Sequence, residues 1–498
     1  MAKIIIIGGG VSGLSAGIYA QLSGHNATIC EMHSVAGGNL TAWRRGDYEI
    51  DNCIHWLTGT NPASPLHALW EELGALGDGI PVYQPESLFT CRQGNTEISL
   101  TRDLDALRRR MNGISPEDKR ETDSLISAVK LLQRVCGIGG DDHNEGLDSS
   151  SLLRFPTLAK YYRLTAKELS LRFKHPLLRD FIASFWEEDF GALALVFVFA
   201  HFCGENGDLP VLGSRGMAER MTNRFLSLGG ELMLKKQAVR INLDEGRARS
   251  VDLADGSRIE ADYIVLTVDP AVAFGKLIGS PMPSQIKVLY DNPRAKRFSS
   301  IQCAFAARVS DIGFRGDLVV RVPREHLNII GSDRIILREF SHEKGYAPEG
   351  MTVLQGMIFC DEDRCVDLIS LWKRDRDAYL EFKRKFAKVA EDVISHNLAS
   401  RNSQLKLLDL WTPATYKRYT ASDVGSYMSF VLPSKMLPSR KSNRVRGIPN
   451  LLLATQWQQC PGGLPIAAVG GREAIKSINR LEAKIHANSR APQTVTIS

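Results

Sequence analysis

Residues Lys3–Glu31 read KIIIIGGGVSGLSAGIYAQLSGHNATICE, and their pattern predicts the fold. Its β-branched start, residues 3–7, is typical of a buried parallel strand. Three glycines in the spacing GxGxxG follow directly, and residues 14–22 then show a helical pattern that ends at Gly24. Residues 26–30 form a second predicted strand. The order strand, glycine turn, helix and strand predicts a parallel βαβ unit.

The glycines of this unit, Gly8, Gly10 and Gly13, allow a tight turn in which the backbone can approach a pyrophosphate group. The helix that follows presents free N–H groups and the positive end of its dipole, and both attract an anion. Glu31 ends the second strand, where a carboxylate can accept hydrogen bonds from ribose hydroxyls. The pattern therefore predicts a dinucleotide site. A glycine-rich turn without a ligand is the alternative.

The residues after the acid read MHSVAGGNL, from Met32 to Leu40, and contain the glycine pair Gly37 and Gly38. At this point the chain resembles the FAD-dependent amine oxidase and phytoene desaturase superfamily. In that superfamily a glycine pair follows the ribose-binding acid and is usually followed by Arg. Asn39 stands in the place of the Arg, so a cation expected near the phosphates is replaced by an amide. The resemblance implies that the cofactor is FAD.

Residues 47–59 read DYEIDNCIHWLTG and look like the FDxGxH segment of retinol saturases and carotenoid isomerases. Asp51 and His55 match that segment, whereas Cys53 replaces its glycine. Because the segment passes close to the flavin ring in relatives, the resemblance implies a catalytic role for His55, as a proton donor or as a polar contact to substrate. The alternative is a histidine that forms local hydrogen bonds and shapes the pocket.

Two further stretches resemble the same superfamily. Residues 213–217 look like its glycine loop ahead of a helix, and Val239 lies where relatives close over the adenine. Near the C-terminus, a helix is predicted to start after Gly463 and to direct its positive dipole end at the flavin, while Gln456 takes the place of a family acid. The predicted cofactor contacts are Gly8, Gly10, Val11, Ser12, Gly13, Glu31, Met32, Gly38, Asn39, Leu40, Val239, Gln456, Gly463, Leu464, Pro465 and Ile466.

These pieces predict an α/β fold with two domains. The Rossmann-type FAD-binding domain would consist of three discontinuous segments, residues 1–65, 206–270 and 411–485. The intervening residues, 66–205 and 271–410, are expected to form an α+β substrate domain of mixed sheet and helices. Residues 486–498 are expected to be a flexible tail.

Composition limits the class of protein. Of 498 residues, 44% are hydrophobic and 24% charged, and the net charge is +6. This is the balance of a globular protein, and the small positive excess does not indicate a nucleic-acid partner. The nine cysteines show no zinc-site spacing, which favours reduced thiols, a cytoplasmic protein and no metal site. No signal peptide or membrane-spanning run is predicted, and the oligomeric state is left open.

Two segments are rich in Lys and Arg. Residues 152–185 interleave cations with aromatic and leucine residues, and residues 435–446 form a second basic cluster. The first segment indicates either an amphipathic surface helix that contacts anionic lipid or the solvated face of a cap helix. The second cluster could contact lipid in the same way or belong to a soluble loop. The apolar run Ala192–Ala200 could line a pocket for an oily substrate or belong to the core.

The resemblance implies an FAD-dependent oxidoreductase that moves a hydride between flavin N5 and a carbon of a long apolar unsaturated lipid. A carotenoid, another isoprenoid or a fatty acid would serve as substrate. Desaturation, saturation and double-bond isomerisation share this chemistry and cannot be told apart at this level. The alternatives are a flavin amine oxidase, in which aromatic rings cage an amine, and a flavin-bearing binding protein without catalysis.

Overall fold

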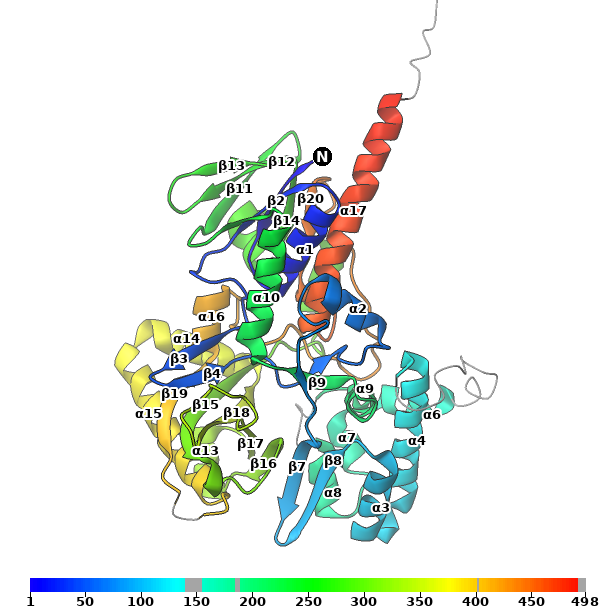
Figure 1. Cartoon of the computed structure of the whole chain (residues 1–498), viewed down its shortest axis with the longest axis vertical. Coiled ribbons are helices and arrows are strands. Elements are labelled where there is room, and N and C mark those ends of the chain that lie inside the picture. Colours follow the sequence, from blue (N-terminus) through cyan, green and yellow to red (C-terminus); the bar gives the residue numbers. More distant parts are fainter. Residues whose placement is uncertain (139–154, 184–188, 401–402, 491–498) are drawn as a thin grey trace, which may run out of the picture. The chain divides into compact units, whose positions relative to one another are not determined.

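The computed structural model describes residues 1–138, 155–183, 189–400 and 403–490 (Figure 1). The chain divides into two compact units. Unit 1 contains residues 1–38, 218–291 and those from 440 onward, and unit 2 contains residues 39–217 and 292–439.

The boundaries of these units differ from the predicted domain boundaries. Two stretches that were predicted to lie in the FAD-binding domain, residues 39–65 and 411–439, belong to unit 2. For residues 39–65, hydrogen bonds explain this placement. Gln355 donates its side-chain amide to the carbonyl oxygen of Asp51 at 2.7 Å, and the backbone N–H of Ser214 donates to Oδ2 of the same aspartate at 2.7 Å.

Unit 1 is built on a parallel sheet with the strand order β10–β2–β1–β14–β20. The strands are β1 (Lys3–Ile7), β2 (Asn26–Cys30), β10 (Glu231–Met233), β14 (Tyr263–Leu266) and β20 (Leu451–Leu453). The four isoleucines of β1 are buried, as expected for the central strand of a sheet that is covered on both faces. The predicted βαβ unit is therefore confirmed.

The other elements of unit 1 include a small antiparallel sheet, β11–β12–β13. The bounds are α1 (Val11–Leu22), β11 (Ala238–Asp244), β12 (Arg247–Leu253), β13 (Arg258–Glu260), α11 (Pro270–Val272), the π-helix Ala273–Ile278, α12 (Ser284–Tyr290), the 3-10 helix Gln456–Gln458 and α17 (Leu464–Arg490). A further helix, α10 (Gly213–Ser227), begins in unit 2 and belongs to unit 1 from Ala218. Because α17 continues to Arg490, the expected tail is helical over residues 486–490, and the rest of it lies outside the described residues.

Helices α1 and α17 lie side by side and run parallel (Figure 1). Near their starts, the Ser15 hydroxyl donates to the carbonyl oxygen of Ala468 at 2.6 Å. Near the end of α1, the Asn479 amide donates to the hydroxyl of Ser23 at 3.0 Å. A Cβ on Gly471 would lie 2.5 Å from the backbone nitrogen of Ala16, so only glycine permits this approach. The N-termini of the two helices therefore lie at the same end of unit 1.

Unit 2 contains a seven-stranded sheet with the order β19–β15–β18–β17–β16–β7–β8. Its strands are β7 (Ser87–Gln93), β8 (Thr96–Thr101), β15 (Ser299–Arg308), β16 (Asp317–Arg321), β17 (Arg334–Glu339), β18 (Met351–Cys360) and β19 (Lys406–Trp411). All neighbouring pairs are antiparallel except β16 and β7, which are parallel. The mixed sheet matches the predicted fold class.

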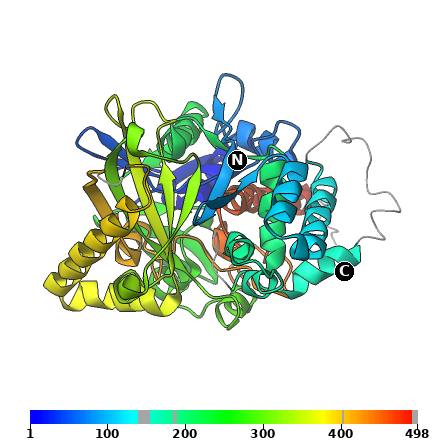
Figure 2. The same ribbon diagram turned by 90° about the horizontal axis from the view of Figure 1, so that it is seen from below.

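One face of this sheet packs against helices (Figure 2). The helices are α13 (Leu327–Ile330), α14 (Glu362–Arg374) and α15 (Arg376–Ser395). Apolar side chains at alternate strand positions, such as Phe305, Leu354 and Leu337, form this core. Because successive strand residues point to opposite faces, the residues between them lie on the other face, where the candidate site is found.

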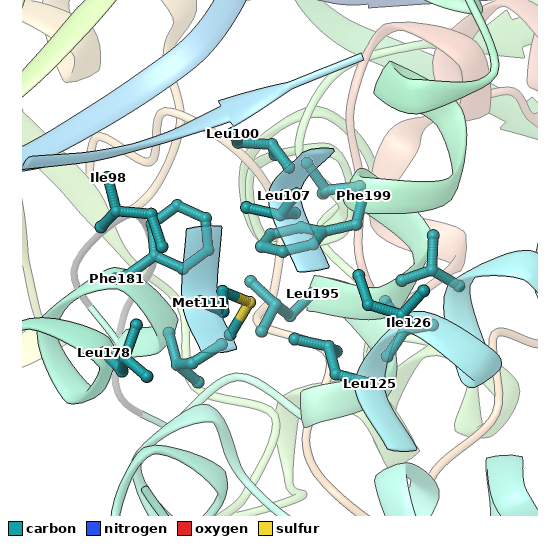
Figure 3. Packing of buried hydrophobic residues seen from close by; sticks show 14 of the residues in the cluster. Ile98, Leu100, Leu107, Met111, Leu125, Ile126, Leu178, Phe181, Leu195 and Phe199 are labelled. Carbon is teal, nitrogen blue, oxygen red and sulfur yellow. The ribbon is translucent and has the colours of Figure 1, made fainter. Parts of the chain in front are cut away.

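A second group of helices in unit 2 encloses a second apolar core (Figure 3). They are α3 (Leu104–Ile114), α4 (Lys119–Cys136), α6 (Phe155–Arg163), α7 (Ala166–Ser170), α8 (Pro176–Ala183) and α9 (Ala192–Cys203). Leu195 and Phe199 of α9 pack there against Leu125 and Phe181. The apolar run Ala192–Ala200 thus belongs to the core.

The first basic segment does not form one amphipathic helix. Its described residues form α6, α7 and α8, because the backbone turns before Pro176, where Asp118 accepts hydrogen bonds from the N–H groups of Lys174 and His175. Several of its cations are paired with acids of the neighbouring helix region. Lys160 contacts Glu121 at 2.5 Å, and the ammonium of Lys174 also contacts Glu117 at 3.0 Å.

Short elements complete unit 2: β3 (Ala42–Arg45), β4 (Tyr48–Asp51), β5 (Leu57–Thr58), α2 (Pro65–Glu72), β6 (Val82–Tyr83), β9 (Gly207–Pro210) and α16 (Pro413–Thr420). Among the helices that the structure describes, none is both long enough and apolar enough to cross a bilayer.

Candidate functional site

The glycine-rich loop of unit 1 joins β1 to α1. The N–H of Gly8 donates to the carbonyl of Cys30 at 2.9 Å, which holds the loop at the carboxyl end of the sheet. A Cβ on Gly13 would lie 1.9 Å from the carbonyl oxygen of Gly8, so the helix can start this close to the loop only with glycine there. No side chain caps the first turn of α1, which contains Val11 and Ser12 and carries no acid. Its N–H groups and dipole suit an anion.

The second glycine pair packs against this loop. The N–H of Gly37 donates to the carbonyl oxygen of Gly9 at 2.8 Å. A Cβ on Gly38 would lie 3.2 Å from the Cα of Gly10, and Gly38 has a positive φ of 62°. The two glycine segments thus present adjacent backbone without side chains, which is the arrangement that a pyrophosphate needs for close approach.

Glu31 lies beside the loop and is buried. One carboxylate oxygen accepts from the N–H of Gly9 at 2.7 Å and the other from the N–H of His33 at 2.9 Å. These bonds fix the carboxylate, and each oxygen keeps a lone pair that could accept from a ribose hydroxyl. Met32 follows directly and is half-buried.

Val239, the predicted adenine contact, lies at a β-bulge between β11 and β12, where the register shifts between Ala238 and Arg240. The bulge leaves its side chain 42% exposed. An exposed apolar side chain suits contact with a flat aromatic base.

The start of α17 carries the remaining predicted contacts in unit 1. The N–H of Gly463 donates to the side-chain oxygen of Gln456 at 2.9 Å, so this residue ties the helix start to the end of β20. The next three residues, Leu464, Pro465 and Ile466, are half-buried, and no acid lies in the first turn. Arg440, which belongs to the second basic cluster of the sequence, donates to the carbonyl of Ile466 at 3.0 and 3.2 Å and therefore has a structural contact.

Unit 1 therefore fits FAD. Two parallel helices, α1 and α17, begin at the same end without acids in their first turns, beside a glycine cradle and the fixed carboxylate of Glu31. Two positive dipole ends and free N–H groups favour a diphosphate and developing negative charge on a flavin.

Two predicted cofactor contacts belong to unit 2. Asn39, in the place of the family Arg, donates its amide to the carbonyl of Tyr427 at 3.2 Å and accepts from Asn52 at its own carbonyl at 3.0 Å. Asn39 therefore connects two segments of unit 2 by hydrogen bonds, and it does not carry the positive charge of the family Arg. Leu40 is buried.

Asp51 anchors the segment that leads to His55. Its carboxylate accepts from the hydroxyl and the N–H of Ser214, at 2.6 and 2.7 Å, from the N–H of Cys53 at 3.0 Å and from the hydroxyl of Tyr346 at 3.2 Å. Four donors satisfy this buried carboxylate. Asp51 therefore shapes the segment and has little capacity left for a ligand.

The sheet face opposite the helices carries a row of polar side chains. Register places Arg338 opposite Asp317 on one neighbouring strand and opposite Gln355 on the other. Gln302 lies on the same face of β15 and pairs with Met357. These side chains are buried, and sequence reasoning missed all of them. The signal that could have found them is a polar residue at alternate positions of apolar strands.

Arg338 connects the sheet to the His55 segment. Its guanidinium forms two bonds with Asp317, from Nε to Oδ1 at 2.7 Å and from Nη2 to Oδ2 at 2.9 Å. The remaining terminal nitrogen donates to the carbonyl of Ile54 at 2.9 Å. Gln355 holds the same segment through the carbonyl of Asp51. Two sheet side chains thus fix the backbone on either side of Cys53.

His55 lies at a small pocket in unit 2. The pocket is lined by Asp51, Asn52, Cys53, Ile54, His55, Gln302, Ile336, Arg338, Phe340, Gln355 and Met357. The ring of His55 meets the ring of Tyr427 edge-on, with centroids 6.0 Å apart. Burial lowers the pKa of His55 well below its ordinary value, and the charge of Arg338 lowers this pKa further. His55 is therefore neutral at physiological pH, which favours a hydrogen-bonding contact over a role as an imidazolium acid.

In the part of the chain that the structure describes, no three His, Cys, Asp or Glu side chains gather into a possible metal site.

Comparisons with known proteins agree with this geometry. Residues 11–474 match the family of flavin-containing amine oxidoreductases. Prolycopene isomerase from Daucus carota is 23% identical over 85% of this chain and 71% of its own length. For 4,4'-diaponeurosporene oxygenase from Staphylococcus haemolyticus these values are 20%, 98% and 99%, and for 15-cis-phytoene desaturase from Arabidopsis thaliana they are 25%, 53% and 47%.

Solved structures show the same fold. An oxidoreductase from Methanosarcina mazei matches with a TM-score of 0.61 and 14% identity, over 95% of this chain and all of that chain. Cyclohexylamine oxidase from Brevibacterium oxydans matches with a TM-score of 0.57 and 14% identity, over 97% and 99% of the two chains. The protein belongs to the flavin-containing amine oxidoreductase family and is an FAD-dependent oxidoreductase.

Proposed function

We propose that this oxidoreductase acts on carbon–carbon double bonds of a long apolar unsaturated lipid. The observation that supports this most is the similarity, over 85% of the chain or more, to enzymes whose names give prolycopene and diaponeurosporene as substrates. Desaturation, saturation and double-bond isomerisation are all compatible with the proposal.

The bound FAD would accept a hydride from a substrate carbon or return one to it at flavin N5. The residues of unit 1 would hold it: the glycine loop and the start of α1 bind the diphosphate, and Glu31 binds the ribose. In the same proposal the start of α17, with Gly463 and the half-buried Leu464, contacts the flavin. These roles rest on local geometry and on the resemblance.

In unit 2, His55 would contact the substrate near the reacting bond. It is neutral, it lines the pocket, and its backbone is held through Ile54 by Arg338. We expect His55→Ala to slow reduction or reoxidation of the flavin by substrate about 10- to 100-fold while FAD stays bound, because loss of a buried hydrogen-bonding partner costs roughly 1–3 kcal/mol and each 1.4 kcal/mol or so is about tenfold in rate. His396→Ala, at an exposed histidine, is the matched control. Unchanged turnover in His55→Ala would remove the proposed role.

A flavin amine oxidase is the less favoured function. An amine cage needs aromatic rings that face the amine, and the aromatic pair at this pocket, His55 and Tyr427, meets edge-on at 86°. The carboxylate of Asp51, which could have attracted an ammonium group, is satisfied by protein donors. If the holoenzyme releases hydrogen peroxide when it is incubated with a panel of amines, the amine oxidase function becomes the favoured one.

The experiment that tests the proposed function is anaerobic. The purified holoenzyme is incubated with a lipid extract, with and without a chemical reductant, and flavin absorbance and product mass are followed together. Bleaching with a product two hydrogens lighter identifies a desaturase. If pre-reduced flavin is required, a heavier product identifies a saturase, and an unchanged mass with a new isomer identifies an isomerase. No lipid change in either state would contradict the proposal.

Contact with a membrane surface and a cytoplasmic location stay predictions. Ion pairs from Lys160 and Lys174 to neighbouring acids reduce the charge that the first basic segment can offer to anionic lipid. Flotation of the protein with vesicles of anionic and of neutral phospholipid tests the contact. If the protein floats equally with anionic and with neutral vesicles, electrostatic attraction does not contribute to membrane binding.

A further inference from the structure

We propose that unit 2 carries a second ligand site, a group of cations that binds a phosphate group. The site is formed by α15, α16 and β3, and we call it the α15–α16 cation cluster (Figure 1). Its members are Arg376 and Lys383 of α15, Arg418 of α16 and Arg45 of β3. None of the four lines the pocket of His55.

The fold brings these cations together from separate elements. Arg376 and Lys383 are two helical turns apart on α15, so they lie on the same face of that helix. The hydroxyl groups of Tyr379 and Thr412 lie 2.8 Å apart and join the beginning of α15 to the N-cap of α16. Arg418, near the end of α16, is thereby held close to α15.

Three of the four cations have no partner of opposite charge. Within the described residues, no carboxylate forms a hydrogen bond or an ion pair with the side chain of Arg376, Lys383 or Arg418. The acid whose charge reaches Lys383 is Asp409. Its carboxylate is already occupied, by the guanidinium of Arg45 at 2.5 Å and by the indole N–H of Trp43 at 3.0 Å.

The cations of the cluster repel one another. Burial lowers the pKa of the half-buried Lys383. The nearby charges of Arg376, Arg418 and Arg45 lower this pKa further, against the opposite effect of Asp409. An anion bound among these groups would offset both the repulsion and the loss of water around the ammonium group.

Aromatic rings hold two of the guanidinium groups. The guanidinium carbon of Arg376 lies 5.9 Å from the ring centroid of Trp372 and 5.4 Å from that of Tyr379. The guanidinium carbon of Arg418 lies 4.8 Å from the ring centroid of Tyr419. A guanidinium stacked on a ring keeps its N–H edge available and loses little side-chain freedom when that edge binds an anion.

The cluster fits a phosphate group better than a carboxylate. A phosphate monoester carries about two negative charges and three strong acceptor oxygens, so it can contact one ammonium and two guanidinium groups together. A carboxylate carries one charge and two oxygens. The same phosphate chemistry occurs in soluble phosphate esters and in phospholipid headgroups, and the experiment distinguishes these two sources.

The test titrates the holoenzyme with pyrophosphate in a calorimeter, against sodium chloride of equal ionic strength. We expect a dissociation constant of about 1 mM or below, because three charge-assisted hydrogen bonds supply roughly that affinity. Added salt should weaken this binding, since the cations lie near the surface and are screened. Absence of pyrophosphate binding, together with vesicle flotation that does not depend on phosphatidic acid, would overturn the inference.

Flotation identifies the source of the phosphate group. The holoenzyme is mixed with phosphatidylcholine vesicles that contain or lack phosphatidic acid. Pyrophosphate binding without flotation identifies a soluble phosphate ester as the ligand. Flotation that requires phosphatidic acid and is lost in the cluster variants below identifies a lipid headgroup.

Two variants place the binding in the cluster. Lys383→Met and Arg376→Met each remove one cation, and each should weaken pyrophosphate binding about five- to tenfold. Lys388→Met is the matched control, because Lys388 lies further along α15 and is paired with Asp392 at 3.0 Å. It should leave the dissociation constant unchanged, and all three variants should keep full FAD content. Equal weakening in Lys388→Met would overturn the inference.

Thermal unfolding separates a ligand site from a structural role. In phosphate-free buffer, Lys383→Met should unfold at the wild-type temperature or above it, because the variant loses a half-buried charge and keeps an apolar side chain. Pyrophosphate should raise the unfolding temperature of the wild type more than that of Lys383→Met. A less stable Lys383→Met that binds pyrophosphate as the wild type does would show that Lys383 is structural and that the inference is wrong.

Discussion

The glycine-rich loop of unit 1 lies within residues 3–38, whereas the polar face of the unit 2 sheet collects Gln302, Arg338 and Gln355 from three strands. The loop offers backbone groups to a ligand. At Gly13 a side chain would collide with a neighbouring carbonyl oxygen, and the helix that follows has no side-chain cap on its first N–H groups. The sheet face works through side chains that are placed by strand register. The cofactor, which is common to many enzymes, is thus proposed to contact mainly backbone, and the substrate is proposed to contact side chains.

The largest expected effect tests the loop. Gly13→Ala places a Cβ 1.9 Å from the carbonyl oxygen of Gly8, and no side-chain rotation can relieve that contact because both atoms belong to the backbone framework. We expect a destabilisation of more than about 4 kcal/mol, with most of the bound flavin lost. The flavin-to-protein absorbance ratio and a urea titration measure this.

The matched control is Gly113→Ala, the same change at another helical glycine, where a Cβ meets no atom within 4 Å. It should keep full flavin content and gain about 0.5–1 kcal/mol. Equal flavin content in the two variants would show that the close approach at Gly13 is not required.

The next effect tests the sheet face. Arg338→Met leaves the carboxylate of Asp317 buried without its counter-ion, so we expect the free energy of unfolding to fall by about 3–5 kcal/mol. The double variant Arg338→Met/Asp317→Leu removes both charges and should recover most of that loss. The denaturant midpoints of the single and the double variant measure this difference.

The control for that pair is Arg321→Met, which removes a half-exposed cation from the same sheet. It should cost no more than about 1 kcal/mol. A double variant as unstable as Arg338→Met would mean that the lost contact with the carbonyl of Ile54, and not the stranded charge, dominates.

Measuring the free energy of unfolding as a function of pH tests the side chains of unit 2, because this unit contains buried neutral histidines. Burial lowers the pKa of His201 to about 4, below its unfolded value of 6.5. Since the unfolded chain takes up this proton first, the contribution is complete above pH 6.5 and is lost as the pH falls towards 4, by up to about 3 kcal/mol. Between these pH values His201→Leu should show a flatter stability curve than wild type.

An exposed histidine, His396, serves as the control in the pH titration. His396 is the C-cap of α15, and His396→Gln should keep the wild-type dependence of stability on pH. If His201→Leu and wild type lose stability in parallel between pH 6.5 and 4, the buried imidazole of His201 does not govern the acid response.

The smallest expected effect returns to unit 1. Ser15→Ala removes one buried hydrogen bond, from the serine hydroxyl to the carbonyl of Ala468, and should cost about 1 kcal/mol with a slightly weaker hold on FAD. Ser227→Ala, at an exposed hydroxyl, is the control. Thermal unfolding monitored by flavin fluorescence reports both quantities. No difference between the two variants would mean that glycine packing alone aligns α1 with α17.

The sequence allowed one of these regions to be predicted and not the other, for physical reasons. The glycines and Glu31 act on neighbours close in the chain, so their spacing alone indicates the turn. Gln302, Arg338 and Gln355 become a site only when β15, β17 and β18 pair in one register. His55 was found through the family resemblance, but the side chains that hold its backbone were not.

Long-range packing also explains where the structure departs from the sequence-based expectations. The basic segment was read as one helix because its residue pattern is helical, and the turn before Pro176 depends on Asp118, which lies more than 50 residues earlier. Residues 39–65 were assigned by family pattern to the FAD-binding domain, yet their hydrogen bonds with Ser214 and Gln355 place them in unit 2.

The contact between α1 and α17 has a consequence for synthesis of the protein. Helix α1 packs along α17, which is made more than 400 residues later, and β20, which completes the parallel sheet, is made shortly before α17. Unit 1 therefore cannot close until α17 has emerged from the ribosome, whereas unit 2 has all of its chain available once residue 439 has emerged. A nascent chain that stops short of α17 should leave β1 exposed and bind no FAD, so cofactor capture should follow the synthesis of α17.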